Sequence, residues 1–138
     1  MTVVVDTNVL VSGLLSPIGP PGEIVRLIAS GHLEVSYDAR LLAEYHAVLA
    51  RPKLKLHQGQ VRSLLEQLKT RGRLVSAVPS ALTFPDDDDR PFAEVAEASG
   101  AAHLVTGNSR HYPHKHYGTA RVVSPAAFVD EMRAASSR

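Results

Sequence analysis

Strand-like and helix-like segments alternate along this chain, and that alternation limits its fold more than any other feature. Short β-branched and apolar runs predict strands at residues 3–5, 33–37, 74–78, 102–106 and 120–123. Between them, apolar residues at helical spacing predict helices at residues 23–30, 38–50, 60–71 and 91–99, with a last helix from residue 124. We therefore expect an α/β protein, a three-layer α/β/α sandwich around a mainly parallel sheet of about five strands.

Single residues mark several of the predicted boundaries. Asp38 is suited to cap the helix that follows it, and Pro52 interrupts the chain after that helix. Pro91 opens a helix that Gly100 closes. The Pro- and Gly-rich residues 16–22, the segment 80–89 and the polar segment 107–118 are predicted loops.

Composition narrows the class of protein. A chain of 138 residues with 44% hydrophobic content suits one domain, residues 1–138, with a disordered tail at about 134–138. The absence of cysteine excludes disulfides and thiolate zinc sites. No apolar stretch approaches the roughly 20 residues of a membrane helix, and no Lys or Arg precedes the first apolar run as in a signal peptide. We expect a cytoplasmic protein without a membrane partner. A net charge of +1 neither requires nor excludes nucleic acid.

Asp6 ends the first buried strand, at the sheet edge where open α/β sheets bind their ligands. An ionised carboxylate at such a place needs a cation or strong donors. The chain supplies further oxygen groups at Glu44, at residues 86–89 just before a helix, and at Asn108 after the fourth strand. Acids without a built-in counter-charge suit a hard divalent cation, Mg²⁺ or Mn²⁺.

Each of these groups also has an ordinary structural interpretation. Asp6 and its neighbours could form a local turn, and Glu44 could be a solvated acid at the helix edge. The aspartate run complements a helix dipole, and Asn108 could be a loop residue. Glu44 joins the others only if its helix points toward the same sheet edge. The joint placement of the four segments favours a functional site.

Four motifs in order resemble the PIN-domain ribonucleases, over nearly the whole chain. They are the opening Val-Asp-Thr-Asn-Val-Leu around Asp6, an acid in the second helix at Glu44, Asp88-Asp89 before Phe-Ala-Glu-Val-Ala, and Gly-Ala-Ala-His-Leu-Val-Thr-Gly-Asn ending at Asn108. The chain is most similar to the toxin branch of VapC-type toxin–antitoxin systems. The resemblance implies a metal-dependent endoribonuclease, a cognate antitoxin protein and a homodimer.

The resemblance also implies roles for individual residues. The catalytic acids would be Asp6, Glu44 and Asp89, with Asp88 as an alternative metal ligand. Asp6 and Asp89 would bind Mg²⁺ or Mn²⁺, and Glu44 would bind it directly or through water. The polar residues that would orient acids or water are Thr7, Asn8, Thr106 and Asn108. Asn108 stands where the family often has a fourth acid, which leaves open whether one or two metals bind.

Two basic zones could contact the RNA substrate. One contains Arg51, Lys53 and Lys55, followed by basic residues on the outer face of the next helix. The other follows Asn108 and contains Arg110 and His111, with tyrosines that could stack on an unpaired base. A solvated helix face is an equally good interpretation of the basic residues on that helix. His111, His114 and His116 could alternatively form a zinc site, although their spacing lacks the geometry of two ligands on one helix face.

Two other functions remain open at the level of sequence. A Mg²⁺-dependent phosphatase or phosphotransfer domain of the haloacid-dehalogenase type would need a second acid two residues after Asp6, where Asn8 stands. A degenerate domain could bind RNA or a protein without cleaving it, an alternative favoured by the amide at Asn108.

Overall fold

The strand predicted at the start of the chain lies in the middle of the sheet. In the computed structural model, which describes residues 2–137, β1 (Thr2–Val5) pairs in parallel with β2 (Glu34–Tyr37) and with β4 (His103–Val105). The side chains of Val3, Val4 and Val5 are fully buried. A β-branched run covered on both faces is typical of a parallel sheet with helices on either side.

The sheet has the strand order β3-β2-β1-β4-β6-β5. It is completed by β3 (Arg73–Leu74), β6 (Ala120–Val123) and β5 (His116–Tyr117), and the β5–β6 pair is antiparallel while the other pairs are parallel. The expected α/β sandwich with a mainly parallel sheet is confirmed, and the sheet has six strands within residues 2–137 where about five were expected. The order turns at β1, because β2 and β3 lie on one side of it and β4, β6 and β5 lie on the other.

One strand prediction and one loop prediction were inaccurate. Of the predicted strand 74–78, only Leu74 lies in β3, and after the Val75 N–H donates to the Tyr37 carbonyl the chain leaves toward Pro79. Proline cannot donate to a ladder, which limits strands on its N-terminal side. The predicted loop 107–118 contains β5, since a two-residue turn with Gly118 at φ +59° folds it back onto β6.

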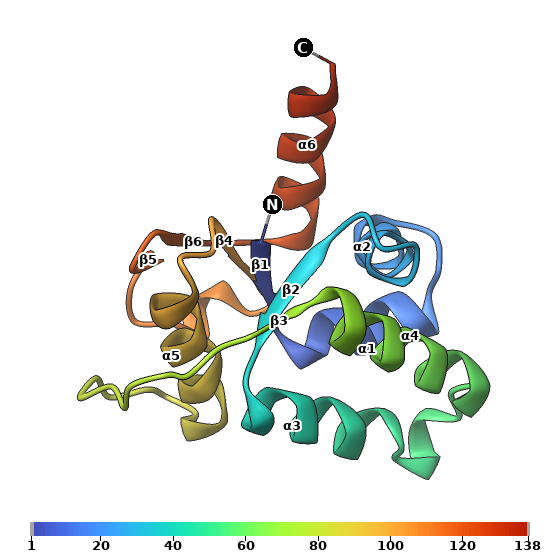
Figure 1. Ribbon diagram of the computed structural model, residues 1–138, viewed down its shortest axis with the longest axis horizontal. Coiled ribbons are helices and arrows are strands. Elements are labelled where there is room, and N and C mark those ends of the chain that lie inside the picture. Colours follow the sequence, from blue (N-terminus) through green and yellow to red (C-terminus); the bar gives the residue numbers. More distant parts are fainter. Residues whose placement is uncertain (1, 138) are drawn as a thin grey trace.

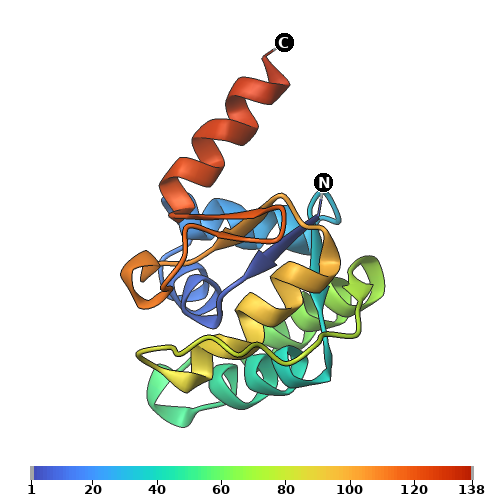
Figure 2. The ribbon, with the colours of Figure 1, turned by 90° about the vertical axis from the view of Figure 1, so that its left-hand side faces the viewer.

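The helices cover both faces of the sheet. They are α1 (Thr7–Leu15), α2 (Pro20–Ala29), α3 (Ala39–Leu49), α4 (Gln58–Arg71), α5 (Arg90–Ser99) and α6 (Pro125–Ser136). In Figure 1, α5 lies on the left of β1, β2 and β3, whereas α1, α2 and α4 lie on the right and α3 lies below the strands. α6 stands out from the body in Figures 1 and 2, and it is anchored by the buried Phe128 and Val129.

Local capping explains several of these boundaries. The Asp38 carboxylate accepts from the N–H groups of Arg40 and Leu41, as expected for the cap of α3. Gly100 ends α5 with a φ of +70°, a conformation that favours glycine. The Ser124 hydroxyl accepts from the Ala127 N–H at the start of α6. α6 continues to Ser136, through most of the segment for which disorder was expected, and residue 138 lies outside the described residues.

α1 was not predicted, and α2 begins earlier than expected. α1 has apolar residues around most of its circumference, so the amphipathic spacing that identifies a surface helix is absent. It packs closely on α2, because a Cβ added to Gly13 would lie 2.4 Å from the Pro21 carbonyl oxygen. α2 starts at Pro20, inside the predicted loop 16–22, since proline is favoured in the first helical turn.

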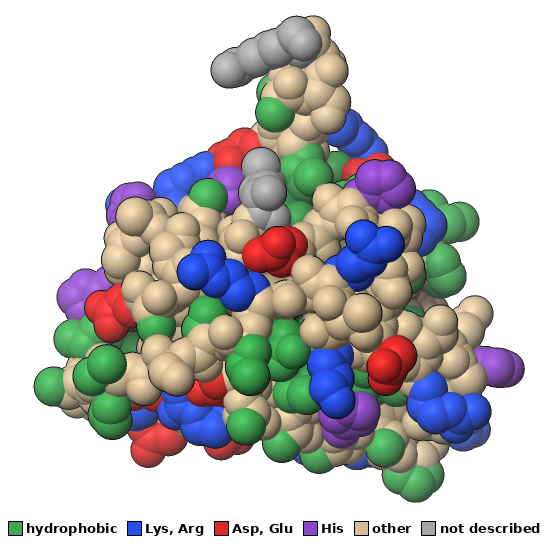
Figure 3. Space-filling model, in the orientation of Figure 1, with side chains coloured by type: hydrophobic (Ala, Val, Ile, Leu, Met, Phe, Trp, Pro, Cys, Tyr) green, Lys and Arg blue, Asp and Glu red, His purple; other side chains and the backbone are tan. Residues whose placement is uncertain are grey.

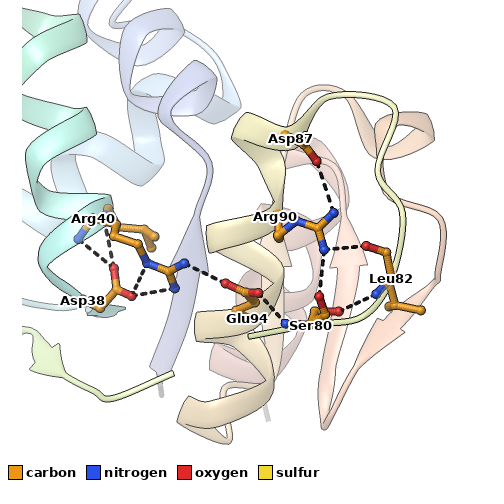
Figure 4. A network of polar contacts seen from close by, with 8 residues as sticks. Asp38, Arg40, Ser80, Leu82, Asp87, Arg90 and Glu94 are labelled. Atoms are coloured by element: carbon orange, nitrogen blue, oxygen red, sulfur yellow. Dashed lines mark hydrogen bonds and ion pairs between the residues drawn. The ribbon is translucent and has the colours of Figure 1, made fainter. Parts of the chain in front are cut away.

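A polar network fixes the loop that leads into α5 (Figure 4). Arg40 of α3 donates to the buried Glu94 carboxylate of α5 at 2.7 Å, and Glu94 also accepts from the backbone of Ser80. The Arg90 guanidinium donates to the Ser80 carbonyl at 2.9 Å and to the Leu82 carbonyl. These contacts tie the segment before the aspartate run to two helices and thereby position the start of α5.

Candidate active site

The site begins where the strand order turns, at the adjacent carboxyl ends of β1 and β4. The Asp6 N–H donates to the Val105 carbonyl at 2.9 Å, which sets the two strand ends side by side. The Thr106 hydroxyl then donates to Asp6 Oδ2 at 2.9 Å. Ligand sites of open α/β sheets form at this kind of position. The Thr106 hydroxyl thus holds one oxygen of the Asp6 carboxylate.

Tyr112 is a second donor to the same oxygen, and it was not predicted. Its hydroxyl lies 2.9 Å from Asp6 Oδ2 and both side chains are buried. Burial raises the pKa of Asp6, while the hydrogen bonds from Thr106 and Tyr112 pull that pKa back down. The two side-chain donors both engage Oδ2, so they hold the carboxylate in one orientation and leave Oδ1 outside this pair of bonds.

Glu44 does point toward the sheet edge that carries Asp6. The next residue, Tyr45, is fully buried and donates its hydroxyl to the Val5 carbonyl at 2.6 Å, which fixes α3 across the end of β1. The Thr7 hydroxyl donates to Glu44 Oε2. Burial raises the pKa of Glu44, and the Asp6 and Asp88 charges raise it further. The direction of α3, which the sequence left open, thus brings the second acid to the first.

Asp89 reaches the same place from the start of α5. It closes the short 3₁₀ turn η2 (Asp87–Asp89), in which the Asp86 carboxylate caps the Asp88 N–H at 2.9 Å. Asp89 Oδ2 is buried and has no hydrogen-bond partner among the described residues. His111 Nδ1 lies 3.7 Å from this oxygen, which is too long for a hydrogen bond and close enough for charge attraction.

Burial, followed by the charge of Asp6, raises the pKa of Asp89 to about 6. Asp86 and Glu44 raise this pKa further, whereas His111 lowers it. A carboxylate whose pKa is raised by two other acids from distant segments shares one electrostatic environment with them. Asp88 is exposed at the rim, so the geometry favours Asp89 over Asp88 as the principal acid of this pair.

Glu44, Asp88 and Asp89 line a cleft of about 360 Å³, and the buried Asp6 directly precedes Thr7, another residue of the lining. The cleft is lined by Thr7, Asn8, Val11, Ser12, Glu44, Val48, Arg51, Asp88 and Asp89. Figure 3 shows acidic side chains gathered at the lower edge of the molecule, below the position of α5 in Figure 1. The cleft therefore joins α1, α3 and the η2 turn before α5, segments that lie far apart in the sequence.

The two asparagines have different positions. Asn8 lines the cleft, and its side-chain oxygen accepts from the Gly107 N–H at 3.0 Å, which ties the segments after β1 and β4 together. Asn108 is exposed and does not line the cleft, and its backbone N–H donates to the Thr106 hydroxyl at 3.1 Å. Its backbone thus supports Thr106, the donor to Asp6.

Of the residues predicted to contact RNA, one lines the cleft and the others lie outside its lining. Arg51 lines the cleft beside Glu44, and its charge lowers the pKa of that carboxyl. Lys53 and Lys55 are exposed beyond it, at and after the 3₁₀ turn η1 (Pro52–Leu54). Arg110 and His111 lie on the 3₁₀ turn η3 (Ser109–His111), on the other side of Asp89.

The idea that tyrosines of the 109–117 segment stack on an unpaired base was wrong. Tyr112 is 5% exposed and Tyr117 is 2% exposed, so neither ring offers a free face. Both rings pack with Phe84, whose centroid lies 6.4 Å from that of Tyr112 and 6.1 Å from that of Tyr117. This aromatic cluster supports the segment and aims the Tyr112 hydroxyl at Asp6.

The donor chemistry of the cleft suits a hard divalent cation. Among residues 2–137, no three acidic or histidine side chains converge closely enough to hold an ion by themselves, and this also applies to His111, His114 and His116. Mg²⁺ keeps several water ligands and needs only one or two carboxylates. Asp6 and the unpartnered Asp89 Oδ2 provide such oxygens, and Glu44 lies beside them.

Sequence reasoning missed Tyr112 because its signal was weak. It lies in a polar segment of histidines, Arg110 and Lys115, where an aromatic residue suggested a surface contact. Its hydroxyl is aimed at Asp6 only because β4, η3 and the aromatic cluster meet in the fold. A signal that could have indicated burial is the presence of two tyrosines, Tyr112 and Tyr117, within this short polar segment.

Comparison with known proteins shows what this chain is similar to. A family model described as PIN domain matches residues 2–110. Uncharacterized protein MJ1680 of Methanocaldococcus jannaschii is 31% identical over 109 residues, which cover 77% of this chain and 70% of that protein. No solved structure matches the chain. Within the part of the chain that the structure describes, none of the helices is long and apolar enough to cross a membrane.

Proposed function

Because the chain belongs to the PIN domain family, a nuclease-type fold, we propose that it is an endoribonuclease that hydrolyses RNA phosphodiester bonds with Mg²⁺ or Mn²⁺. One observation carries the proposal. Asp6, Glu44 and Asp89 come from three distant segments and lie close enough that the charge of Asp6 raises the pKa of both other acids, and Asp89 Oδ2 is buried without a hydrogen-bond partner among residues 2–137. A chain that needed these acids only for its fold would have paired them with its own basic side chains.

The proposed metal ligands are Asp6 and Asp89, with Glu44 as a direct or water-mediated third. A bound Mg²⁺ or Mn²⁺ would lower the pKa of a water molecule and offset the charge that develops on the phosphate. Around it, Thr106 and Tyr112 hold Asp6 Oδ2. Thr7 does the same for Glu44. Such preorganisation keeps each acid in place during the reaction.

The attacking group is proposed to be water. The cleft is lined by acids, an amide, hydroxyls, Arg51 and two valines, and it offers neither a thiol nor a lysine. Thr7 and Ser12 are its hydroxyl side chains, and the Thr7 hydroxyl is engaged by Glu44. Arg51 at the rim is suited to contact a phosphate next to the cleaved bond.

The test is RNA cleavage by purified protein with Mg²⁺ or Mn²⁺. Structured and single-stranded RNA and a generic phosphate monoester are incubated with wild type, Asp6→Asn, Asp89→Asn and the matched control Asp87→Asn. Asp87 is an exposed member of the same aspartate run and pairs with Arg90. We expect RNA cleavage by wild type and Asp87→Asn, and a loss of at least about a hundredfold for the other two variants.

The same experiment separates the alternative functions. Turnover of the monoester without RNA cleavage would indicate a phosphatase. RNA retention without cleavage in either metal would indicate a binding domain that has lost catalysis. Equal cleavage by wild type and Asp89→Asn would refute the assignment of the site.

We further propose that the protein is the toxin of a toxin–antitoxin pair and acts as a homodimer. This part rests on the resemblance of its motifs to the VapC-type branch. The expected result is growth arrest when wild type is expressed in a bacterial host and normal growth with Asp6→Asn. Light scattering of the purified chain should give the mass of a dimer. Normal growth with wild type, under conditions where its RNA cleavage is demonstrated in vitro, would contradict the toxin role.

A further inference from the structure

A second cavity, of about 520 Å³, lies next to the acidic cleft. We call it the basic groove, because its lining includes Arg110, His114, Lys115, His116 and Arg121 and contains no acidic residue. Figure 3 shows Lys, Arg and His side chains gathered over the corner of the molecule where Figure 1 places β5 and β6. A concave surface lined by cations attracts anions more strongly than scattered surface charges do.

Tyr112 connects the groove to the acids. It lines the groove, while its hydroxyl donates to Asp6 Oδ2 at 2.9 Å. Arg110 also lines the groove and directly precedes His111, whose Nδ1 lies 3.7 Å from Asp89 Oδ2. The groove therefore lies next to the two acids that are proposed to bind the metal, since Tyr112 contacts Asp6 and the neighbour of Arg110 lies beside Asp89.

Hydrogen bonds within the segment hold the backbone of the groove. The Val122 N–H donates to the Lys115 carbonyl at 2.9 Å, and the His114 N–H donates to the Tyr117 hydroxyl at 3.2 Å. The edge of the His114 ring packs on Tyr117 with centroids 5.9 Å apart. A surface that is already ordered pays little conformational entropy when it binds a ligand.

We propose that the basic groove binds the phosphodiester backbone of the RNA strand on one side of the bond that is cleaved. This inference rests on the proposed function and gives the substrate a path across the molecule. Arg110 and Lys115 carry the main charges, since Arg121 is paired with Glu131. Because the groove's tyrosine is buried, binding depends on phosphates rather than on base stacking, and the sequence of the strand matters little.

The other basic zone fits this role less well. Arg51 lines the acidic cleft itself, whereas Lys53 and Lys55 lie exposed outside the cleft lining. The charge of Arg51 lowers the pKa of Glu44, so Glu44 partly offsets the attraction of Arg51 for a phosphate. The groove combines concavity, order and a lining free of acids, which suits an extended chain of phosphates.

The experiment measures binding of a fluorescent single-stranded RNA of mixed sequence in EDTA, so that no cleavage is needed. The double variant Arg110→Ala/Lys115→Ala is compared with Arg26→Ala/Arg133→Ala, which removes the same charge from exposed positions of α2 and α6, outside both candidate RNA-contact zones. Losing two phosphate contacts should raise Kd several-fold and reduce the slope of log K against log salt by about 1.4. The control pair should leave that slope unchanged.

Two further measurements complete the test. In cleavage assays with Mn²⁺, the groove variant should raise KM and leave kcat unchanged, because its contacts do not change in the transition state. A labelled polyglutamate peptide tests for an acidic protein segment as the occupant, and it should bind more weakly than RNA.

Each result supports or overturns the proposal that the basic groove binds RNA. Equal salt slopes for wild type and the groove variant would overturn it even if the protein cleaves RNA. Tighter binding of polyglutamate than of RNA would overturn it in favour of a protein partner. If the protein binds RNA through the groove but does not cleave it, the proposal for the groove is supported and the proposed nuclease function is refuted. The failure of one proposal can therefore be distinguished from the failure of the other.

Discussion

Asp89→Asn should stabilise the metal-free protein and remove its response to metal. The pKa of Asp89 is raised from 3.8 to about 6 by burial and by neighbouring acids, so the ionised side chain destabilises the fold at neutral pH. At about 1.36 kcal/mol for each unit of pKa, the ceiling of this effect is about 3 kcal/mol. Water in the open cleft screens part of it, and we expect a gain of about 1 kcal/mol.

The direction of the pKa shift of Asp89 determines the pH range in which its effect on the free energy of unfolding is visible. The unfolded chain releases this proton near pH 3.8, whereas the folded chain holds it up to about pH 6. The contribution of Asp89 to the free energy of unfolding therefore falls as the pH rises from about 4 to about 6, and the full penalty is present above that window. The difference between Asp89→Asn and wild type should grow over the same window.

Thermal unfolding in EDTA at pH 5 and pH 7.5 measures this difference. A gain of about 1 kcal/mol raises Tm by about 3 °C in a domain of this size. With Mn²⁺ at 100 times its Kd, wild type should gain about 2.7 kcal/mol and the variant much less. Asp87→Asn removes an exposed charge paired with Arg90, and it should neither raise Tm in EDTA nor reduce the response to Mn²⁺. A lower Tm for Asp89→Asn in EDTA, or an unchanged response to Mn²⁺, would refute the reasoning.

Three other substitutions test the fold and the site. Gly13→Ala places a Cβ within 2.4 Å of the backbone of α2 and should destabilise the protein by about 1–3 kcal/mol in urea unfolding; no loss would mean that α1 and α2 are less closely packed. Arg40→Ala leaves the buried Glu94 carboxylate without its cation and should cost about 2 kcal/mol, discounted because Arg40 is half exposed, with part of the loss recovered by adding Glu94→Gln. Tyr112→Phe removes a donor that lowers the pKa of Asp6, so calorimetry should show a greater loss of Mn²⁺ affinity at pH 6 than at pH 8; equal losses would argue against this role.

Much of the fold was predictable from sequence because local chemistry determines it. The valine run before Asp6 forms the central strand, and Asp38, Gly100 and Ser124 act as helix boundaries in the structure. Each of these signals depends on one residue and its immediate neighbours. The buried valines also explain why the sheet is parallel, since both faces of their strand are covered.

The rest depends on tertiary contacts that leave little trace in the sequence. α1 lacks an amphipathic pattern because it packs on several sides, and Gly13 shows its function only against α2. The direction of α3, which brings Glu44 to the site, is set by Tyr45 bonding to β1. Tyr112 reaches Asp6 across 106 residues of chain, a distance over which periodicity carries no information.

The most direct test of the shared acidic site is a crystal of the protein grown or soaked with Mn²⁺ and measured for anomalous scattering. The account predicts a peak in the cleft with carboxylate oxygens of Asp6 and Asp89 about 2.1 Å away, the usual distance for a small divalent ion, and Glu44 bound to it directly or through one water. A peak held by other residues, or a cleft that stays empty at Mn²⁺ concentrations that support RNA cleavage, would contradict it.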